Sequence, residues 1–208
     1  SQREEVIRTA VTAIGQAKKY FKDIEFSPHN ATRLDEAFLT EISTAAIEAG
    51  ATTLNISDTV GYAVPDQFGE LIQSLRQHVS NIDQAILSVH CHNDLGMAVA
   101  NSLAAIQAGA RQVECTVNGI GERAGNAAME EIVMALRTRH DVFGVDCAID
   151  SRQIMSTSRM VSEITGYTVP RNKAIVGAEA LDYDTGIFQS GFSKQESYEM
   201  IKAKDIDS

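Results

Sequence analysis

Residues 88–96 read SVHCHNDLG, where an apolar run that starts at residue 85 ends in two histidines separated by one residue. Successive side chains of a β-strand point to opposite faces, so we expect His90 and His92 to point the same way and Cys91 to point away. Two imidazoles that project together from a strand end can supply two ligands of a divalent metal ion. A lone His-X-His pair is more often a partly exposed strand end, so the rest of the chain has to decide between the two interpretations.

Four strand–loop–helix units can be traced through residues 1–140. After an amphipathic helix at 3–20, strands are predicted at 23–27, 52–56, 85–89 and 111–117, and helices at 34–49, 66–78, 95–108 and 127–139. Two helix-to-strand junctions nearly repeat, with EAGAT at 48–52 and QAGAR at 107–111. Such a series of units predicts a parallel sheet with right-handed crossovers.

Polar residues follow every predicted strand, and their placement distinguishes two α/β architectures. In a doubly wound sheet only the loops beside the switch point carry chemistry, whereas in a TIM (β/α)8 barrel all strand ends converge on one site. The residues concerned are Ser27, His29, Asn30, Asp58, Thr59, His90, His92 and the loop 118–126. We therefore expect a TIM-type barrel over residues 1–140, of which four units form half. Residues 141–208 are expected to form a helical appendage, with helices at 151–165 and 194–204.

The composition is that of a globular chain with its own core, since 44% of the 208 residues are hydrophobic and 22% are charged. A formal net charge of -10 argues against nucleic acid or an anionic membrane surface as a partner. No apolar run approaches the roughly 20 residues that span a bilayer, and no signal-peptide pattern opens the chain. The three cysteines fit no zinc spacing, which favours a reducing, cytoplasmic location.

Four motifs give the chain a resemblance to a known family. They are NISDTVG at 55–61, HCHNDLG at 90–96, NGIGERAGN at 118–126 and KAIVG at 173–177. Together they resemble the 2-isopropylmalate synthases, which belong with homocitrate and citramalate synthases to a metal-dependent group that condenses acyl-CoA with 2-oxo acids. The resemblance covers nearly the whole chain and implies the C-terminal half of the catalytic barrel plus the start of the linker behind it. The family's first four strands, with an aspartate metal ligand, and its leucine-sensing domain are expected to have no counterpart here.

The resemblance also implies roles for individual residues. The implied metal ligands are His90, His92 and Asn126, the implied substrate-binding residues are Thr59, Asn118 and Gly119, and the implied catalytic residue is Glu122. The cofactor would be a divalent ion, Mn, Zn or Mg. The implied reaction joins acetyl-CoA to 3-methyl-2-oxobutanoate in leucine biosynthesis: the metal polarises the carbonyl of the oxo acid, while a base removes a proton from the acetyl methyl group.

Two segments depart from the family's pattern. In FSPHN at 26–30, His29 replaces a glutamate and Asn30 replaces an aspartate. In GIFQSG at 186–191, Phe188 replaces a histidine. The family's glutamate and histidine are thought to carry the proton transfers, and Phe188 cannot accept a proton. His29 is therefore either a replacement catalytic base or a solvated loop residue.

Three functions stay open on the sequence alone. The chain could belong to a 2-isopropylmalate synthase, to a synthase that uses a different 2-oxo acid of the homocitrate or citramalate type, or to a truncated relative that binds metal or oxo acid or serves in assembly. The expected small-molecule partners are acetyl-CoA and a 2-oxo acid. Four parallel strands would leave two open edges, so we expect a homo-oligomer or completion by a missing half-barrel.

Overall fold

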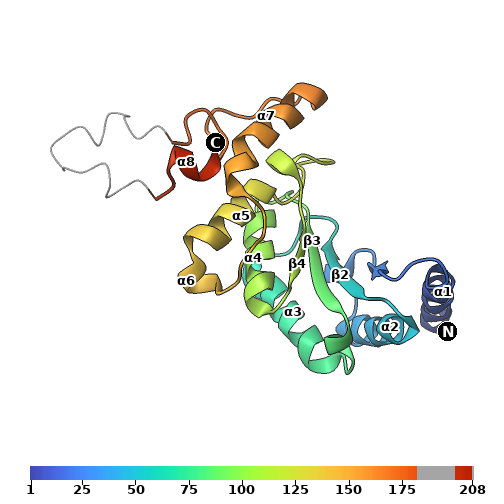
Figure 1. Ribbon diagram of the computed structural model, residues 1–208. Coiled ribbons are helices and arrows are strands. Elements are labelled where there is room, and N and C mark those ends of the chain that lie inside the picture. Colours follow the sequence, from blue (N-terminus) through green and yellow to red (C-terminus); the bar gives the residue numbers. More distant parts are fainter. Residues whose placement is uncertain (182–199, 208) are drawn as a thin grey trace. The chain divides into compact units, whose positions relative to one another are not determined.

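The computed structural model describes residues 1–181 and 200–207, which form two compact units (Figure 1). The strand unit holds residues 1–115 and 121–127, and the helical unit holds residues 116–120 and those from 128 onward. In chain order the strand unit contains α1 (Gln2–Ala17), β1 (Glu25–Phe26), η1 (Ala31–Arg33), α2 (Glu36–Ala49), β2 (Thr53–Asp58), α3 (Pro65–His78), η2 (Ile82–Gln84), β3 (Ile86–Cys91), α4 (Ala98–Ala108) and β4 (Gln112–Glu114).

The four strands form one parallel sheet in the order β1-β2-β3-β4, as the series of strand–helix units predicts. The longest register joins β2 to β3 and runs from the pair Thr53 and Ile86 to the pair Asp58 and Cys91. The outer strands are shorter than predicted, with two residues in β1 and three in β4. Pro28 lacks the backbone N–H that a longer β1 would use in the ladder.

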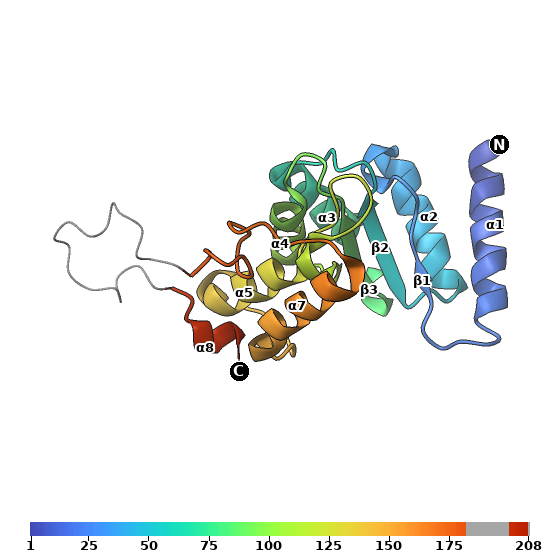
Figure 2. The same ribbon diagram turned by 90° about the horizontal axis from the view of Figure 1, so that it is seen from above.

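Side chains of β2 and β3 alternate between two faces of the sheet. One face lies toward α2, α3 and α4 and is apolar, with Leu54, Ile56, Leu87 and Val89 at most 4% exposed. The opposite face, which we name the inner face, is polar apart from Ile86 and carries the side chains of Glu25, Thr53, Asn55, Ser57, Ile86, Ser88, His90, Gln112 and Glu114. Figure 2 shows α1 lying alongside α2, at the β1 side of the sheet. The sheet therefore has one helix-covered face and one polar face.

The sheet is curved, so that side chains of its two outer strands meet. Gln112 Nε2 on β4 donates a hydrogen bond to Glu25 Oε2 on β1 at 3.0 Å, although two strands lie between them. In a flat sheet these strands would be about 14 Å apart, which is three spacings of about 4.8 Å. The inner face is thus concave, and the predicted α/β partial barrel is confirmed.

Two helices end where predicted, at residues 49 and 108, and a glycine follows each, while the helices predicted to begin at 34, 95 and 127 begin two or three residues later, at 36, 98 and 129. Gly50 and Gly109 follow α2 and α4 in the left-handed conformation, at φ 116° and 114°. Helix α4 begins at Ala98 and not at residue 95, because the chain first turns at Gly96, where φ is 72°. The side chain of Asn93 then accepts a hydrogen bond from the N–H of Ala98 at 3.1 Å.

The helical unit contains η3 (Val117–Gly119), α5 (Met129–Thr138), α6 (His140–Phe143), η4 (Ser151–Gln153), α7 (Ile154–Thr165) and α8 (Ala203–Ile206). Its buried core consists of Val133, Met134, Ile154, Val176 and Ile206. The helix predicted at 151–165 is confirmed, with a 3-10 first turn. Most of the helix predicted at 194–204 lies outside the described residues. The domain boundary predicted after residue 140 stays a prediction.

None of the helices in the described ranges has the length and hydropathy of a segment that could cross a membrane.

A buried carboxylate fixes the turn after β2, and its removal tests this part of the fold. Asp58 is fully buried and accepts hydrogen bonds from Thr32 Oγ1 at 3.0 Å, Tyr62 N at 3.2 Å and Ala63 N at 3.0 Å. We expect Asp58→Ala to lower the free energy of unfolding by about 2–3 kcal/mol, because it leaves these donors without their acceptor. Urea denaturation measures the change, and Asp83→Ala, at an exposed position, is the control. Equal stabilities for the two variants would contradict the assignment.

Candidate active site

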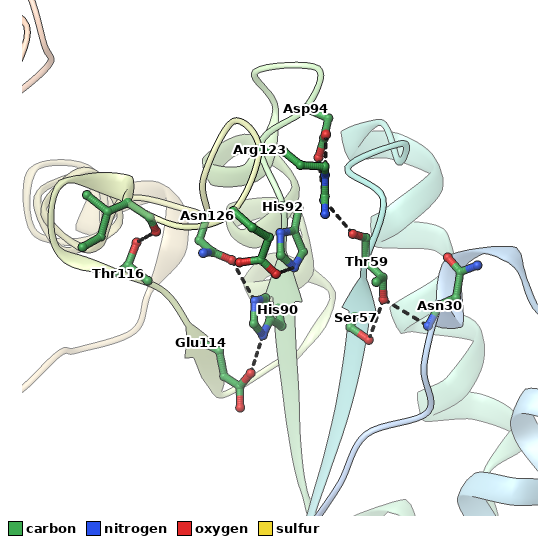
Figure 3. A network of polar contacts seen from close by, with 12 residues as sticks. Asn30, Ser57, Thr59, His90, His92, Asp94, Glu114, Thr116, Arg123 and Asn126 are labelled. Atoms are coloured by element: carbon green, nitrogen blue, oxygen red, sulfur yellow. Dashed lines mark hydrogen bonds and ion pairs between the residues drawn. The ribbon is translucent and has the colours of Figure 1, made fainter. Parts of the chain in front are cut away.

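The two histidines of β3 and the loop after it project together, as strand alternation predicts (Figure 3). Their rings stack with centroids 5.0 Å apart and an interplanar angle of 14°. His92 is buried at 7% exposure, whereas His90 is half-buried. Cys91 points into the core, where burial raises the pKa of its thiol to about 12. The pair therefore presents two imidazoles to the carboxyl end of the sheet.

The loop 121–127 folds back against the end of β3 and brings Asn126 to the histidines. Asn93 N donates to Gly125 O at 2.9 Å, and Ala127 N donates to Cys91 O at 3.1 Å. Asn126 Oδ1 then lies 2.8 Å from Nε2 of His90. Gly121 makes room for this arrangement, because a Cβ atom there would lie 2.0 Å from Asn126 Nδ2.

The opposite ring nitrogen of His90 faces a carboxylate on β4. His90 Nδ1 and Glu114 Oε2 are 2.5 Å apart. Burial acts to raise the pKa of Glu114, but hydrogen bonds from Glu25 and His90 outweigh it and lower that pKa. The pKa of Glu25 rises to about 7, because of burial and of the adjacent Glu114 carboxylate. An ionised Glu114 can only accept, so the ring proton of His90 belongs on Nδ1.

The donor atoms at this strand end suit a divalent cation. His90 Nε2 and Asn126 Oδ1 are in hydrogen-bond contact at 2.8 Å, a separation close to the about 3 Å between two ligands that share one ion at about 2.1 Å. His92 Nδ1 is buried with no hydrogen-bond partner among the described residues. Burial and the neighbouring His90 lower the pKa of His92, which favours the neutral imidazole that a metal requires.

Few side chains in the described residues are placed to bind a metal ion together. Within residues 1–181 and 200–207, no group of three or more His, Cys, Asp and Glu side chains could hold a metal ion. Two imidazoles and one amide oxygen leave coordination positions for further oxygen ligands. The residues present therefore fit part of a metal shell.

Arg123 ties together the loops that follow three strands. Its guanidinium donates to both carboxylate oxygens of Asp94 at 2.8 and 2.9 Å, and to Thr59 O at 2.8 Å (Figure 3). Arg123 itself adopts the left-handed conformation, at φ 57°. The neighbouring Glu122 places Oε1 4.0 Å from His92 Nε2, and a backbone hydrogen bond and His92 lower its pKa. Glu122 is thus an ionised side chain beside the histidine pair.

Thr59 reaches the same region from the loop after β2. Its hydroxyl accepts a hydrogen bond from Asn30 N at 3.0 Å and lies 3.4 Å from Ser57 Oγ. Asn30 adopts the left-handed conformation at φ 59°, and His29 before it is exposed. Arg123 joins Thr59 to the loop of Glu122 and Asn126. His29 is connected to Thr59 through its chain neighbours, since Asn30 N donates to Thr59 Oγ1 and Ser57 Oγ donates to Pro28 O.

The remaining predicted site residues belong to the helical unit or lie outside the described residues. Asn118, at φ 63°, uses both side-chain atoms within that unit: Ser158 Oγ donates to its Oδ1 at 2.5 Å, and its Nδ2 donates to Ser158 O at 3.1 Å. Gly119 follows at φ 65°. These contacts give Asn118 a structural role, and the substrate role of both residues stays a prediction. Phe188 lies outside the described residues.

Sequence reasoning missed Glu25 and Glu114. The signal that could have indicated Glu114 is the alternation of Gln112, Glu114 and Thr116 with apolar or small residues in a strand expected to be buried. For Glu25 no local signal exists, because its contact with β4 depends on the curvature of the sheet.

The role of Gly121 can be tested with a matched glycine. We expect Gly121→Ala to displace Asn126 and to weaken binding of Mn²⁺ or Zn²⁺ by about 10-fold or more, a loss of the size seen for groups that orient ligands. Gly96→Ala is the control, since Gly96 also has a positive φ, 72°, but nothing within 4 Å of its added Cβ. Isothermal titration calorimetry measures both. Equal metal affinities in the two variants would refute the steric argument.

Solved structures with similar folds include HMG-CoA lyases. The HMG-CoA lyase from Pseudomonas aeruginosa matches with a TM-score of 0.64 and 17% identity, over 80% of this chain and 57% of that chain. An HMG-CoA lyase from Acinetobacter baumannii, in complex with coenzyme A and 3-methylmalate, matches with a TM-score of 0.63 and 20% identity, over 85% of this chain and 58% of that chain. At these identities the likeness shows the fold alone.

Sequence comparison gives much higher identities. The 2-isopropylmalate synthases of Nitrosomonas eutropha and Nitrosococcus oceani are 57% and 58% identical to this chain. Both matches extend over 204 residues, which is 98% of this chain and 40% of each relative. The chain thus spans about two fifths of the length of the curated relatives that it matches. The HMGL-like family model matches residues 1–161. With most of its residues matched by that model, the chain belongs to the HMGL-like family.

Proposed function

We propose that this chain forms the C-terminal half of the catalytic barrel of a 2-isopropylmalate synthase, which joins acetyl-CoA to 3-methyl-2-oxobutanoate with a divalent metal ion. The observation that carries the proposal is the meeting of His90, His92 and Asn126 at one strand end, in a chain 55–58% identical to curated 2-isopropylmalate synthases. The complex of an HMG-CoA lyase with coenzyme A supports a CoA thioester as one substrate of this fold.

In this proposal the histidines and Asn126 hold the metal ion, which acts as a Lewis acid on the oxo-acid carbonyl when bound. The ion is Mn²⁺, Zn²⁺ or Mg²⁺, since imidazole and amide oxygen are compatible with all three. His90 and Asn126 contribute Nε2 and Oδ1 on adjacent sides of one position. Burial of His92 excludes water from its ring and keeps the ring neutral.

The neighbouring loops bind and orient the organic substrates. Glu122 is ionised beside His92, so it balances the charge of the ion and repels a misplaced carboxylate. Thr59 lies at the same end of the sheet, where Arg123 fixes its backbone carbonyl. We assign the oxo acid to the Thr59 side and acetyl-CoA to the loop that carries Glu122, while the substrate role of Asn118 and Gly119 stays a prediction. A cytoplasmic location follows from the cysteine usage and from acetyl-CoA as substrate.

The proton acceptor is the assignment in which this chain departs from its family, because His29 and Phe188 replace the family's glutamate and histidine. An imidazole is a common general base in enzymes, so His29 is a candidate for this role. His29 is exposed, which also fits a solvated loop residue.

We further propose that a second half-barrel, from a second copy or from an additional four-strand segment, completes the site. The outer strands β1 and β4 are the sheet's edges, and the inner face between them is lined by polar side chains. The 208 residues expressed alone should therefore self-associate at micromolar concentration. Sedimentation velocity measures this, and a compact monomer would contradict completion by a second copy.

Activity is tested in a hybrid enzyme, in which this chain replaces the 204-residue matching segment of the Nitrosomonas eutropha relative. We expect thiol release from acetyl-CoA that depends on 3-methyl-2-oxobutanoate. His90→Ala should lower it by more than about 100-fold, because loss of a metal ligand costs at least as much as loss of an outer partner. Metal uptake should also fall at acidic pH, because protons compete with the metal ion for the ligand nitrogens.

Two further variants of the hybrid complete this test. His78→Ala, at an exposed position on α3, should leave the rate unchanged and serves as the control. His29→Ala distinguishes the two interpretations of that residue: an unchanged rate makes it a loop residue, and a fall of about 10²–10⁴-fold makes it a general base. A hybrid with no oxo-acid-dependent thiol release would refute the proposed function.

A further inference from the structure

Glu114 is placed by the sheet itself beside a candidate metal ligand. His90 on β3 and Glu114 on β4 are partners in the strand register, and both side chains lie on the inner face. The resulting contact, 2.5 Å from His90 Nδ1 to Glu114 Oε2, is fixed at both ends by β-strand backbone. A contact built on two paired strands is more rigid than one made by loops.

Glu114 is in turn contacted by inner-face residues of the first two strands. Glu25 on β1 and Asn55 on β2 both contact its carboxylate. Gln112 Nε2, two residues before Glu114, holds Glu25 Oε2 at 3.0 Å. We name Glu25, Gln112 and Glu114 the inner-face brace. The brace spans from one edge strand to the other and leaves the Glu114 carboxylate directed at His90.

The inner-face brace determines which ring nitrogen of His90 carries the proton and which one can bind a cation. A carboxylate accepts hydrogen bonds and donates none, so Nδ1 carries the proton. Nε2 then keeps its lone pair. The Asn126 amide lies 2.8 Å away, and in the metal-free chain it can satisfy that lone pair only by turning its Nδ2 toward Nε2, since Oδ1 accepts and cannot donate. A metal-ligating histidine commonly has its other nitrogen fixed by a carboxylate in this way.

His92 is held differently. Its Nδ1 has no hydrogen-bond partner among the described residues, and its ring is fixed by burial and by stacking on His90. The two imidazoles are therefore unequal: one is oriented by a carboxylate and the other by packing.

We propose that Glu114, supported by Glu25 and Gln112, is a positioning residue that holds His90 in the Nδ1-protonated tautomer, with Nε2 directed at the cation position. The metal part of this inference rests on the proposed function, while the tautomer part does not.

The first test is the tautomer itself, in the metal-free chain. ¹⁵N-histidine labelling and NMR distinguish a protonated Nδ1 from a protonated Nε2 by their nitrogen chemical shifts. We expect the His90 signal, assigned by its loss in His90→Ala, to show Nδ1–H. Glu114→Gln should move it toward a mixture of tautomers, because an amide can accept or donate. Glu70→Gln, at an exposed position on α3, should leave it unchanged.

The second test is metal affinity, with Zn²⁺ as the probe in calorimetry. Glu114→Gln should raise the Kd about 10–100-fold, and Glu25→Gln should raise it by less, since Glu25 acts through Glu114. A His90 that is Nε2-protonated in the unmodified chain would overturn the proposal, whether or not Glu114→Gln folds. So would an unchanged tautomer and Kd in Glu114→Gln. A chain that binds no Zn²⁺ but shows the tautomer shift would refute the metal site and leave the positioning role standing.

Discussion

The register of β3 against its two neighbours sets His90 between Ser57 on β2 and Glu114 on β4. A slip of one residue would turn every side chain of the strand to the other face, and Val89 and Cys91 would then occupy the inner face. Burial of Leu54, Ile56 and Val89 against the helices opposes such a slip, since each fully buried aliphatic side chain contributes about 1.5–3 kcal/mol. The apolar face of the sheet thus fixes the position of the polar one.

The inner face gathers acidic and basic groups in a half-buried space. Glu25 and Glu114 lie close enough for the pKa of Glu25 to reach about 7, so the two carboxyl groups do not both ionise readily near neutral pH. Beyond them, His90 Nε2 lies 2.8 Å from Asn126 Oδ1, and His92 Nδ1 is buried with no hydrogen-bond partner among the described residues. The carboxyl groups, imidazoles and amide oxygen that meet at this strand end form a set of groups suited to bind a cation.

Local signals allowed much of this fold to be predicted from the sequence. The glycines after α2 and α4, the apolar strands and the alternation around His90 and His92 each depend on neighbours within a few residues. The contacts of Glu114 with His90 and of Glu25 with Gln112 could not be predicted, because they depend on register and curvature, which no single strand encodes. The docking of the loop 121–127 on β3 is also non-local, so the distance from His90 to Asn126 emerged only with the structure. The roles of Asn118 and Gly119 depend on contacts that their own segment does not specify.

Arg123 has a consequence for how the family could change its substrates. Loops on a barrel are usually regarded as modules that vary independently on a constant scaffold. Here one guanidinium bonds Asp94 and Thr59 O, and its own backbone leads directly to Asn126. A residue inserted before Thr59, or deleted near Asp94, would pull on the loop that carries a candidate ligand. Loops grafted from relatives should therefore be transplanted as a set of three, because a single grafted loop would break the contacts of Arg123 and displace Asn126.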